Sequence, residues 1–133
     1  MKNTISLKNT RQFKAVYDER KAKSDNNIIV FIRKNDLNIN RLGISVSKKV
    51  GNSVERHRLT RLIRESYRLH EDEFNSGLDI VVVGKQGANP KKGDKNYPVK
   101  CMDIERSLLR LAGYHKIIKK QNEKNTDRTD KNI

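Results

Sequence analysis

The chain has 133 residues, of which 34% are hydrophobic and 35% are charged, so it suits one domain with a modest core and a heavily charged surface. Thirty Lys and Arg residues against sixteen Asp and Glu residues leave a formal net charge of +14, which repels itself unless a polyanion neutralises it. Nucleic acid is the first candidate for that polyanion, and an anionic membrane surface is the weaker one.

The first part of the chain predicts a short helix followed by a strand. Residues 9–20 can form a helix capped by Asn9 or Thr10, with Gln12 three residues after Asn9 in a box-like spacing. Its apolar residues share one face at i, i+3 and i+4 spacing: Phe13, Val16 and Tyr17. The β-branched and aromatic run at 28–32 is typical of a strand.

The middle of the chain predicts a strand, a connection and a long helix. Residues 42–46 alternate large apolar residues with small ones, as a strand with one buried face does, and an extra short strand is an option near 35–41. Residues 47–55 contain the turn signal Gly-Asn and should be a connection. Residues 56–74 carry a clear helical period.

The last predicted elements are a buried strand and a helix. Residues 78–84 have an unbroken apolar centre, which indicates a strand buried on both faces. Residues 86–98 form a loop rich in Gly, Lys and Pro. Residues 99–112 predict a helix, with Gly113 as its stop signal.

The order of these elements favours an α+β fold, an α-β sandwich of one mixed sheet and a helical layer. We expect one domain over residues 1–118 and a polar, disordered tail over 119–133. No apolar run is long enough for a membrane-spanning helix, and residues 1–8 lack the apolar stretch of a signal peptide. The expected location is therefore the cytoplasm.

The long helix predicted at 56–74 has two chemically different sides. On a wheel of about 100° per residue, one side collects Leu59, Leu62, Ile63, Ser66 and Tyr67. The opposite arc collects four arginines: Arg58, Arg61, Arg64 and Arg68. A planar guanidinium can bind two phosphate oxygens at once and is more weakly hydrated than an ammonium group.

Positive charge is concentrated around this helix. Between Arg41 and Arg68 there are eight Lys or Arg residues and two acids, which leaves +6. A solvated helix face usually mixes both signs at i,i+4 spacing, whereas only Glu65 interrupts this arc. The pattern favours polyanion binding over a merely solvated face.

Residues 41–64, RLGISVSKKVGNSVERHRLTRLIR, resemble the signature block of the bacterial ribonuclease P protein family, in which a strand of the type LGISVSKKVGN precedes an R-N-R helix. Further resemblance extends to about residue 114, in LKN…FKAVY, IIVF, LDIVVVGK and SLLRL. The chain departs from the family at His57, where Asn is usual, and at Thr60, where Lys is usual. His57 either donates a hydrogen bond to RNA or is a surface residue without a role, whereas Thr60 removes one cation.

This resemblance implies an α-β sandwich with a left-handed β-α-β crossover, similar to a ribosomal protein domain, although general statistics favour the right-handed sense. It also implies two RNA-facing surfaces. One would contact a catalytic RNA through Lys48, Lys49, Arg56, His57, Arg58, Arg61, Arg64 and Arg68. The other, a cleft between the first helix and the sheet, would hold the single-stranded 5′ leader of precursor tRNA with Phe13, Tyr17 and Phe31. Core packing is the alternative interpretation of Phe13 and Tyr17.

The polypeptide lacks the side-chain clusters of a protein nuclease. Its acids are scattered and its three histidines have no metal-ligand spacing, while the single cysteine, Cys101, excludes an intramolecular disulfide. The resemblance implies a subunit of the endoribonuclease that removes the 5′ leader, with catalysis by Mg²⁺ bound to the RNA and no cofactor bound by the protein alone. The implied partners are ribonuclease P RNA and the precursor tRNA leader, with neither DNA nor a membrane among them.

Two other functions fit parts of the sequence. A ribosomal or ribosome-assembly RNA-binding protein could share the composition, fold and charge. A helix-turn-helix DNA regulator could place residues 56–68 in a major groove, but it requires a preceding helix and tight turn where LGISVS is strand-like.

Overall fold

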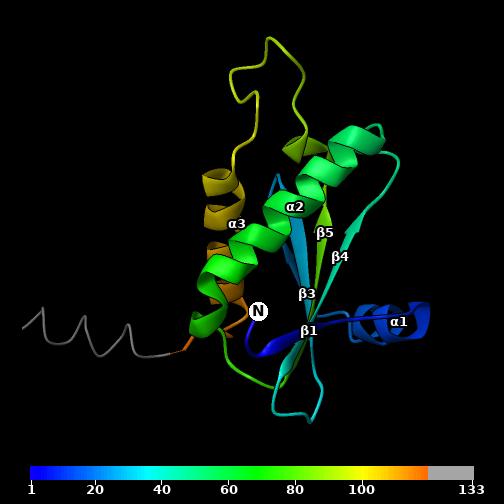
Figure 1. Ribbon diagram of the computed structural model, residues 1–133, viewed down its shortest axis with the longest axis vertical. Helices are drawn as coiled ribbons and strands as arrows, with labels where there is room; N and C mark the ends of the chain where they lie inside the picture. The colour runs from blue at the N-terminus through cyan, green and yellow to red at the C-terminus, as the bar shows by residue number, and fades with distance from the viewer. Residues whose placement is uncertain (120–133) are drawn as a thin grey trace, which may run out of the picture.

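The computed structural model describes residues 1–119, which fold around one five-stranded sheet (Figure 1). Its strands are β1 (Thr4–Ser6), β2 (Ala22–Ser24), β3 (Ile28–Lys34), β4 (Asn40–Val46) and β5 (Leu78–Gly84). Its helices are α1 (Thr10–Asp18), α2 (Ser53–His70) and α3 (Cys101–Tyr114), with 3₁₀ turns η1 (Glu71–Glu73) and η2 (Gln86–Ala88). The strand order is β1-β4-β5-β3-β2, with β1-β4 and β4-β5 parallel and the other pairs antiparallel. The predicted mixed α+β fold is confirmed.

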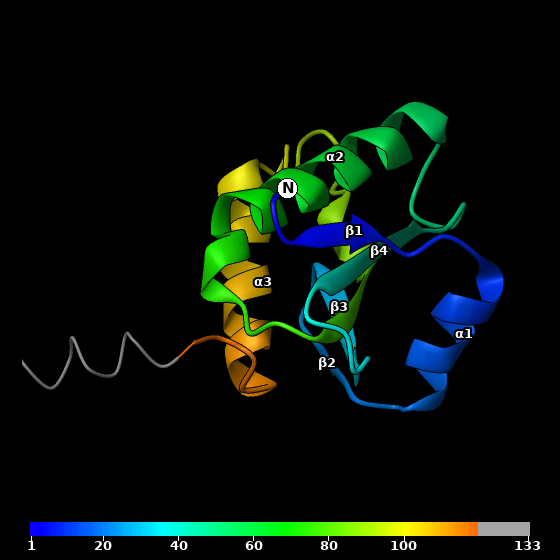
Figure 2. The same cartoon turned by 60° about the horizontal axis from the view of Figure 1, so that its bottom comes forward.

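The two faces of the sheet are covered unequally. Helices α2 and α3 lie on one face and the short α1 on the other (Figure 2). Side chains alternate along a strand, so Ile80 and Val82 of β5 enter the main core under α2 and α3, whereas Val81 enters a smaller cluster under α1. All three are fully buried, which confirms that the central strand β5 is buried on both faces.

Strands β4 and β5 are adjacent and parallel, and α2 connects them. In Figure 1 both strands point upward, α2 crosses in front of them, and β5 lies to the left of β4. This is the left-handed sense of the crossover, as the resemblance implies. It places α2 across the sheet with one long side free of the core.

Helix α2 begins three residues before the predicted start because of a local cap. The Asn52 side chain accepts a hydrogen bond from the Glu55 backbone N at 2.8 Å, and the Glu55 carboxylate accepts one from the Asn52 backbone N at 2.9 Å. This capping box satisfies two of the free N–H groups at the helix start. The Gly-Asn pair is therefore the end of a turn and the cap of the helix at once.

The sequence prediction missed two short strands, β1 and β2. The prediction of an extra strand near 35–41 is wrong. The position of strand β1 is fixed by residues far along the chain. Just before the strand, the backbone N atoms of Lys2 and Asn3 donate hydrogen bonds to the Glu71 carboxylate at 3.1 and 2.9 Å. Strand β2 is exposed throughout and contains no large apolar residue. Residues 35–39 form the turn between β3 and β4, where the Asn35 side chain accepts a hydrogen bond from the Leu37 backbone N at 2.8 Å.

The end of α3 also corrects the sequence prediction. Gly113 lies inside the helix, which ends at Tyr114. The left-handed residue that closes the helix is Lys116, with φ of 61°, and the Ile117 backbone N donates to the Ala112 carbonyl at 3.1 Å. The predicted tail over 119–133 lies, apart from Lys119, outside the described residues.

His70 connects the end of α2 to α3 and makes stability depend on pH. Its Nδ1 lies 2.5 Å from the Glu73 carboxylate and its Nε2 lies 2.7 Å from that of Glu105. Burial alone would lower the pKa of His70, but the hydrogen bonds and charges of both carboxylates raise it above the ordinary 6.5. The folded state thus holds this proton more tightly than the unfolded chain, so the stabilisation is complete below pH 6.5 and is lost as pH rises through the raised pKa.

We expect His70→Gln to reduce the free energy of unfolding by about 1 kcal/mol at acidic pH and by less at alkaline pH. Urea unfolding of both proteins between about pH 5.5 and pH 8.5 measures the difference. The comparison with the variant removes the contribution of other titrating groups. Two curves that stay parallel over this range would contradict the role assigned to His70.

Candidate nucleic-acid interface

The free side of α2 carries the cations that the helical wheel predicts. Leu59, Ile63, Ser66 and Tyr67 are buried against the sheet and α3, as expected from the period. Arg61 and Arg64 point away from the core, are exposed, and form no ion pair with any residue in 1–119. His57 is exposed on the same side. Two guanidinium groups one helical turn apart are therefore available to an anion.

The other two arginines of the arc have partners within the protein. Arg68 donates to the Glu65 carboxylate from Nε at 2.9 Å and from Nη2 at 2.6 Å, and this pairing lowers the pKa of Glu65. Arg58 is half-buried and donates from Nη2 to the Val99 carbonyl at 2.6 Å, which joins α2 to the start of α3. The four predicted arginines thus differ in availability, and Arg61 and Arg64 are the free pair.

The turn before α2 adds two more exposed cations, Lys48 and Lys49. The side chains of Gln86 and Asn89 hold this turn in place, donating to the carbonyls of Lys49 and Val50, each at 2.8 Å. Arg56, half-buried at the first turn of the helix, donates from Nε to the Gly51 carbonyl at 3.2 Å. The predicted basic residues therefore lie along one continuous stretch, from this turn through α2. Thr60 stands at the second position where the sequence departs from the family pattern, and its hydroxyl donates a hydrogen bond to the Arg56 carbonyl at 3.0 Å.

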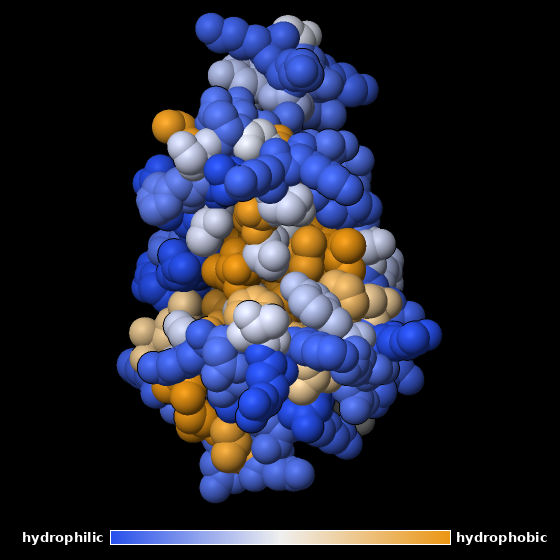
Figure 3. All heavy atoms as spheres, turned by 90° about the vertical axis from the view of Figure 1, so that its right-hand side faces the viewer, coloured by the Kyte–Doolittle hydropathy of each residue, from blue (hydrophilic) through white to orange (hydrophobic). Residues whose placement is uncertain are grey.

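The three predicted aromatic residues come together on the sheet face that carries α1. The ring centroids of Tyr17 and Phe31 lie 4.9 Å apart, edge to face, and those of Phe13 and Tyr17 lie 6.4 Å apart. All three residues are half-buried and pack against Leu7, Val16 and Val81. Figure 3 shows apolar residues gathered in the middle of the face seen there, with polar residues around them. We call these three rings the aromatic cluster; it combines packing with exposure.

Glycine at position 43 determines where the Phe13 ring lies. A Cβ at Gly43 would stand 2.6 and 2.7 Å from the Phe13 ring atoms Cζ and Cε2. Only a residue without a side chain lets this ring rest directly on strand β4. The small residue in the LGISV segment therefore has a specific structural use beside the cluster.

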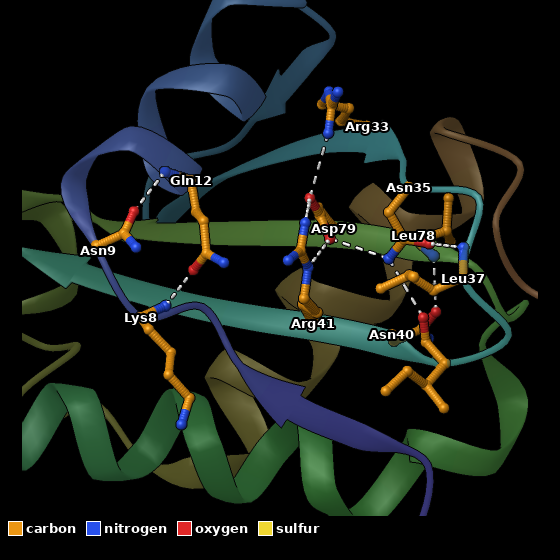
Figure 4. Close-up of polar contacts among 11 residues, drawn as sticks. Lys8, Asn9, Gln12, Arg33, Asn35, Leu37, Asn40, Arg41, Leu78 and Asp79 are labelled. Carbon is orange, nitrogen blue, oxygen red and sulfur yellow. Dashed lines mark hydrogen bonds and ion pairs between the residues drawn. The ribbon is translucent and has the colours of Figure 1, made fainter.

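A buried carboxylate beside the cluster was missed by the sequence analysis. Asp79 has 1% of its side chain exposed and accepts two hydrogen bonds from Arg41, both at 2.8 Å, and one from Asn35 at 2.9 Å (Figure 4). The Arg33 Nη1 atom lies 3.6 Å from Asp79 Oδ2. Burial alone would raise the pKa of Asp79, but these hydrogen bonds and charges hold it below its ordinary value. The one signal in the sequence is an acid within an otherwise apolar strand.

Among residues 1–119, no group of three or more His, Cys, Asp or Glu side chains could hold a metal ion. Over the same residues, no helix is both long and apolar enough to cross a membrane.

A mixed sheet, an arginine-bearing helix on one face and a half-buried aromatic cluster on the other define a small basic α+β protein. At the edge of the sheet, Arg64 of the helix and Phe13 of the cluster line one hollow. Residues 1–112 match the model of the family described as Ribonuclease P. The ribonuclease P protein component of Lachnoclostridium phytofermentans is 55% identical over 113 residues, 85% of this chain and 90% of the relative. That of Clostridium botulinum strain Loch Maree is 43% identical over 106 residues, 79% and 88% of the two chains. The chain belongs to the ribonuclease P protein family.

Solved structures agree with this assignment. The ribonuclease P protein of Staphylococcus aureus superposes with a TM-score of 0.72 at 28% identity, covering 86% of this chain and 97% of that one. The protein of Thermotoga maritima gives a TM-score of 0.67 at 30% identity, covering 80% and 94%. Both similarities span the sheet and its helices rather than a fragment.

Proposed function

We propose that this chain is the protein subunit of ribonuclease P and that it binds both the catalytic RNA and the 5′ leader of precursor tRNA. Family membership supports the subunit role. The observation that carries the rest has two parts. Arg61 and Arg64 on α2 are exposed and form no ion pair within residues 1–119. The aromatic cluster on the other face of the sheet is half-buried, and its Phe13 lines the same hollow as Arg64. A DNA regulator of the helix-turn-helix type is not supported, because β4 and a turn precede α2.

The proposed contact with the catalytic RNA is electrostatic. Arg61 and Arg64 can each donate two hydrogen bonds to a phosphate, and the exposed lysines at 48 and 49 continue the positive surface. Phosphates neutralised in this way release their counterions, so the RNA needs less Mg²⁺ to keep its fold. Arg58 and Arg68 contribute less, because their side chains already have partners in the protein.

The proposed contact with the leader is stacking. Unpaired bases stack on exposed aromatic rings, at about 1–3 kcal/mol per base in other single-strand binders. Phe13, Tyr17 and Phe31 offer such rings, and the leader exists only in the precursor. The protein thereby favours precursor over mature tRNA without taking part in bond cleavage. In this proposal Mg²⁺ ions held by the RNA perform the hydrolysis, and the protein alone needs no cofactor.

Reconstitution with ribonuclease P RNA tests this function. At low Mg²⁺, adding the protein should stimulate removal of the 5′ leader from precursor tRNA, while the protein without the RNA should not cleave. A ribosomal or ribosome-assembly protein would bind RNA in the same buffer without that stimulation. A lack of stimulation would therefore overturn the proposal.

Gly43→Ala provides a sharper test of the aromatic cluster. The new methyl group would push the Phe13 ring away from β4. We expect the preference of the holoenzyme for precursor over mature tRNA to fall about tenfold, comparable to the loss of one stacked base. Affinity for the catalytic RNA alone should not change. Filter-binding titrations of both tRNAs measure this, and Ser45→Ala, on the same side of β4, is the matched control. An unchanged preference would exclude Phe13 from the leader contact.

A further inference from the structure

A hollow lined with basic side chains lies at the sheet edge formed by β2, apart from the free side of α2. Strand β2, the end of β3, residues 75–78 and the residues that close α3 surround it. Six of its lining residues are cations, Arg20, Lys21, Lys23, Arg33, Lys34 and Lys116, against one acid, Asp36. We call this feature the basic hollow.

Strand β2 lies between the basic hollow and the aromatic cluster, and its residues face both. Ala22 is paired with Phe31, and Lys23 with Val30. Because side chains alternate along a strand, Ala22 lies on the side of the aromatic cluster, whereas Lys23 and Lys21 lie on the side of α3. Burial of His115, at the end of α3, lowers the pKa of its imidazole, and the positive charges of both lysines lower that pKa further. Ala22 and Arg33, on the side of the aromatic cluster, line the hollow as well, so the hollow reaches both sides of the sheet at this edge.

The positive charge of the hollow has little compensation within the protein. Of its cations, Arg33 alone forms an ion pair with a residue in 1–119, at 3.6 Å from Asp79. Lysines on an edge strand commonly prevent pairing with another sheet, which would account for Lys21 and Lys23. It does not account for the cations that other segments add to the same hollow, Arg20, Lys34 and Lys116.

The hollow lies where several segments of the chain reverse direction. Three non-glycine residues in 1–119 have a left-handed backbone: Arg20, Asp36 and Lys116, with φ near 60°. All three line this hollow. Each stands where an element ends: Arg20 after α1, Asp36 in the turn between β3 and β4, and Lys116 after α3. The hollow is therefore built where three chain reversals meet.

We propose that the basic hollow binds phosphates of the same RNA strand whose bases stack on the aromatic cluster, so that the 5′ leader continues around edge strand β2. This inference rests on the proposed leader contact. Arg33 follows Phe31 by two residues on the same side of β3 and also lines the hollow, so it connects the two features. Tyr114, 60% exposed at the rim, offers a further ring for stacking.

The test compares precursor tRNAs with leaders of about four and about twelve nucleotides. Their binding to the holoenzyme is measured over a range of salt concentrations. The wild type should bind the long leader more tightly and with a steeper salt dependence. In Lys21→Gln/Lys23→Gln that advantage should largely disappear, and the slope for the long leader should fall by about 1.4, at ~0.7 per lost phosphate contact. Both lysines are exposed, so circular dichroism should show an unchanged fold.

Lys95→Gln/Arg106→Gln is the matched control, since it removes two exposed cations far along the chain from the hollow. It should keep the advantage of the long leader. Equal losses in both double variants would show an effect of net charge and overturn the basic hollow as a site. The wild type could prefer precursor to mature tRNA while the Lys21→Gln/Lys23→Gln variant still binds the long leader more tightly than the short one. That result would overturn the basic hollow as a leader site and leave the proposed leader contact at the aromatic cluster standing. A wild type without any preference for the precursor would instead overturn the proposed leader contact.

Discussion

Asp79→Ala should reduce the free energy of unfolding by about 3–5 kcal/mol. The substitution leaves the Arg41 guanidinium, whose side chain is 20% exposed, without the carboxylate that accepts two of its hydrogen bonds. It also removes the acceptor of the Asn35 amide. Domains of this size are stable by roughly 5–15 kcal/mol, so the loss is a large share of the total. The midpoint of urea unfolding, at unchanged m-value, measures it.

Two further variants separate the buried pair from a general effect of charge. Asp18→Ala removes an acid from an exposed pair with Lys14 and should change stability little. Asp79→Leu combined with Arg41→Met removes the buried carboxylate together with its half-buried partner and should recover most of the stability lost in Asp79→Ala. If Asp79→Ala were as mild as Asp18→Ala, the buried pair would not stabilise the fold.

The same carboxylate should contribute to unfolding by acid. The pKa of Asp79 is lower in the folded protein than its ordinary 3.8, so the folded state binds this proton more weakly than the unfolded chain. Its stabilisation is therefore present above about pH 3.8 and is lost as pH falls through the lowered pKa. The acid limb of the stability curve should be flatter in Asp79→Ala than in the wild type.

Local patterns predicted the elements whose causes are local. The period of α2 identified its buried side and its free side, and the apolar run of β5 identified the central strand. Strands β1 and β2 depend on pairing with distant segments and have no pattern of their own. The Arg41–Asp79 pair requires the register of β4 against β5, which joins residues 38 positions apart.

The candidate site shows the same division. A helical wheel predicts the side of the helix on which each arginine lies, but not the groups that its side chain contacts. The partner of Arg58 is the Val99 carbonyl, 41 positions away, and only the tertiary structure reveals it. The partner of Arg68 is Glu65, and its i,i+3 spacing could have been read from the sequence. The aromatic cluster needed the family resemblance, because helical spacing alone favours core packing.

Arg61→Ala/Arg64→Ala should weaken binding to ribonuclease P RNA by about 100-fold, at roughly 1.4 kcal/mol for each charge-assisted contact. Both side chains are exposed, so the fold should not suffer. Two lost phosphate contacts should also reduce the slope of log affinity against log salt by about 1.8, at ~0.9 per phosphate. Titration of the RNA at several salt concentrations measures both quantities.

The salt slope matters more than the affinity, because it counts phosphates while affinity also responds to any disturbance of the protein. Lys95→Ala/Arg106→Ala makes the same change in net charge away from α2 and should leave the slope close to that of the wild type. Arg68→Ala should fall between the two, since Glu65 already holds that guanidinium. If the slope for Arg61→Ala/Arg64→Ala equalled that of the control, the free side of α2 would not lie on the RNA, and the weaker binding would need another cause.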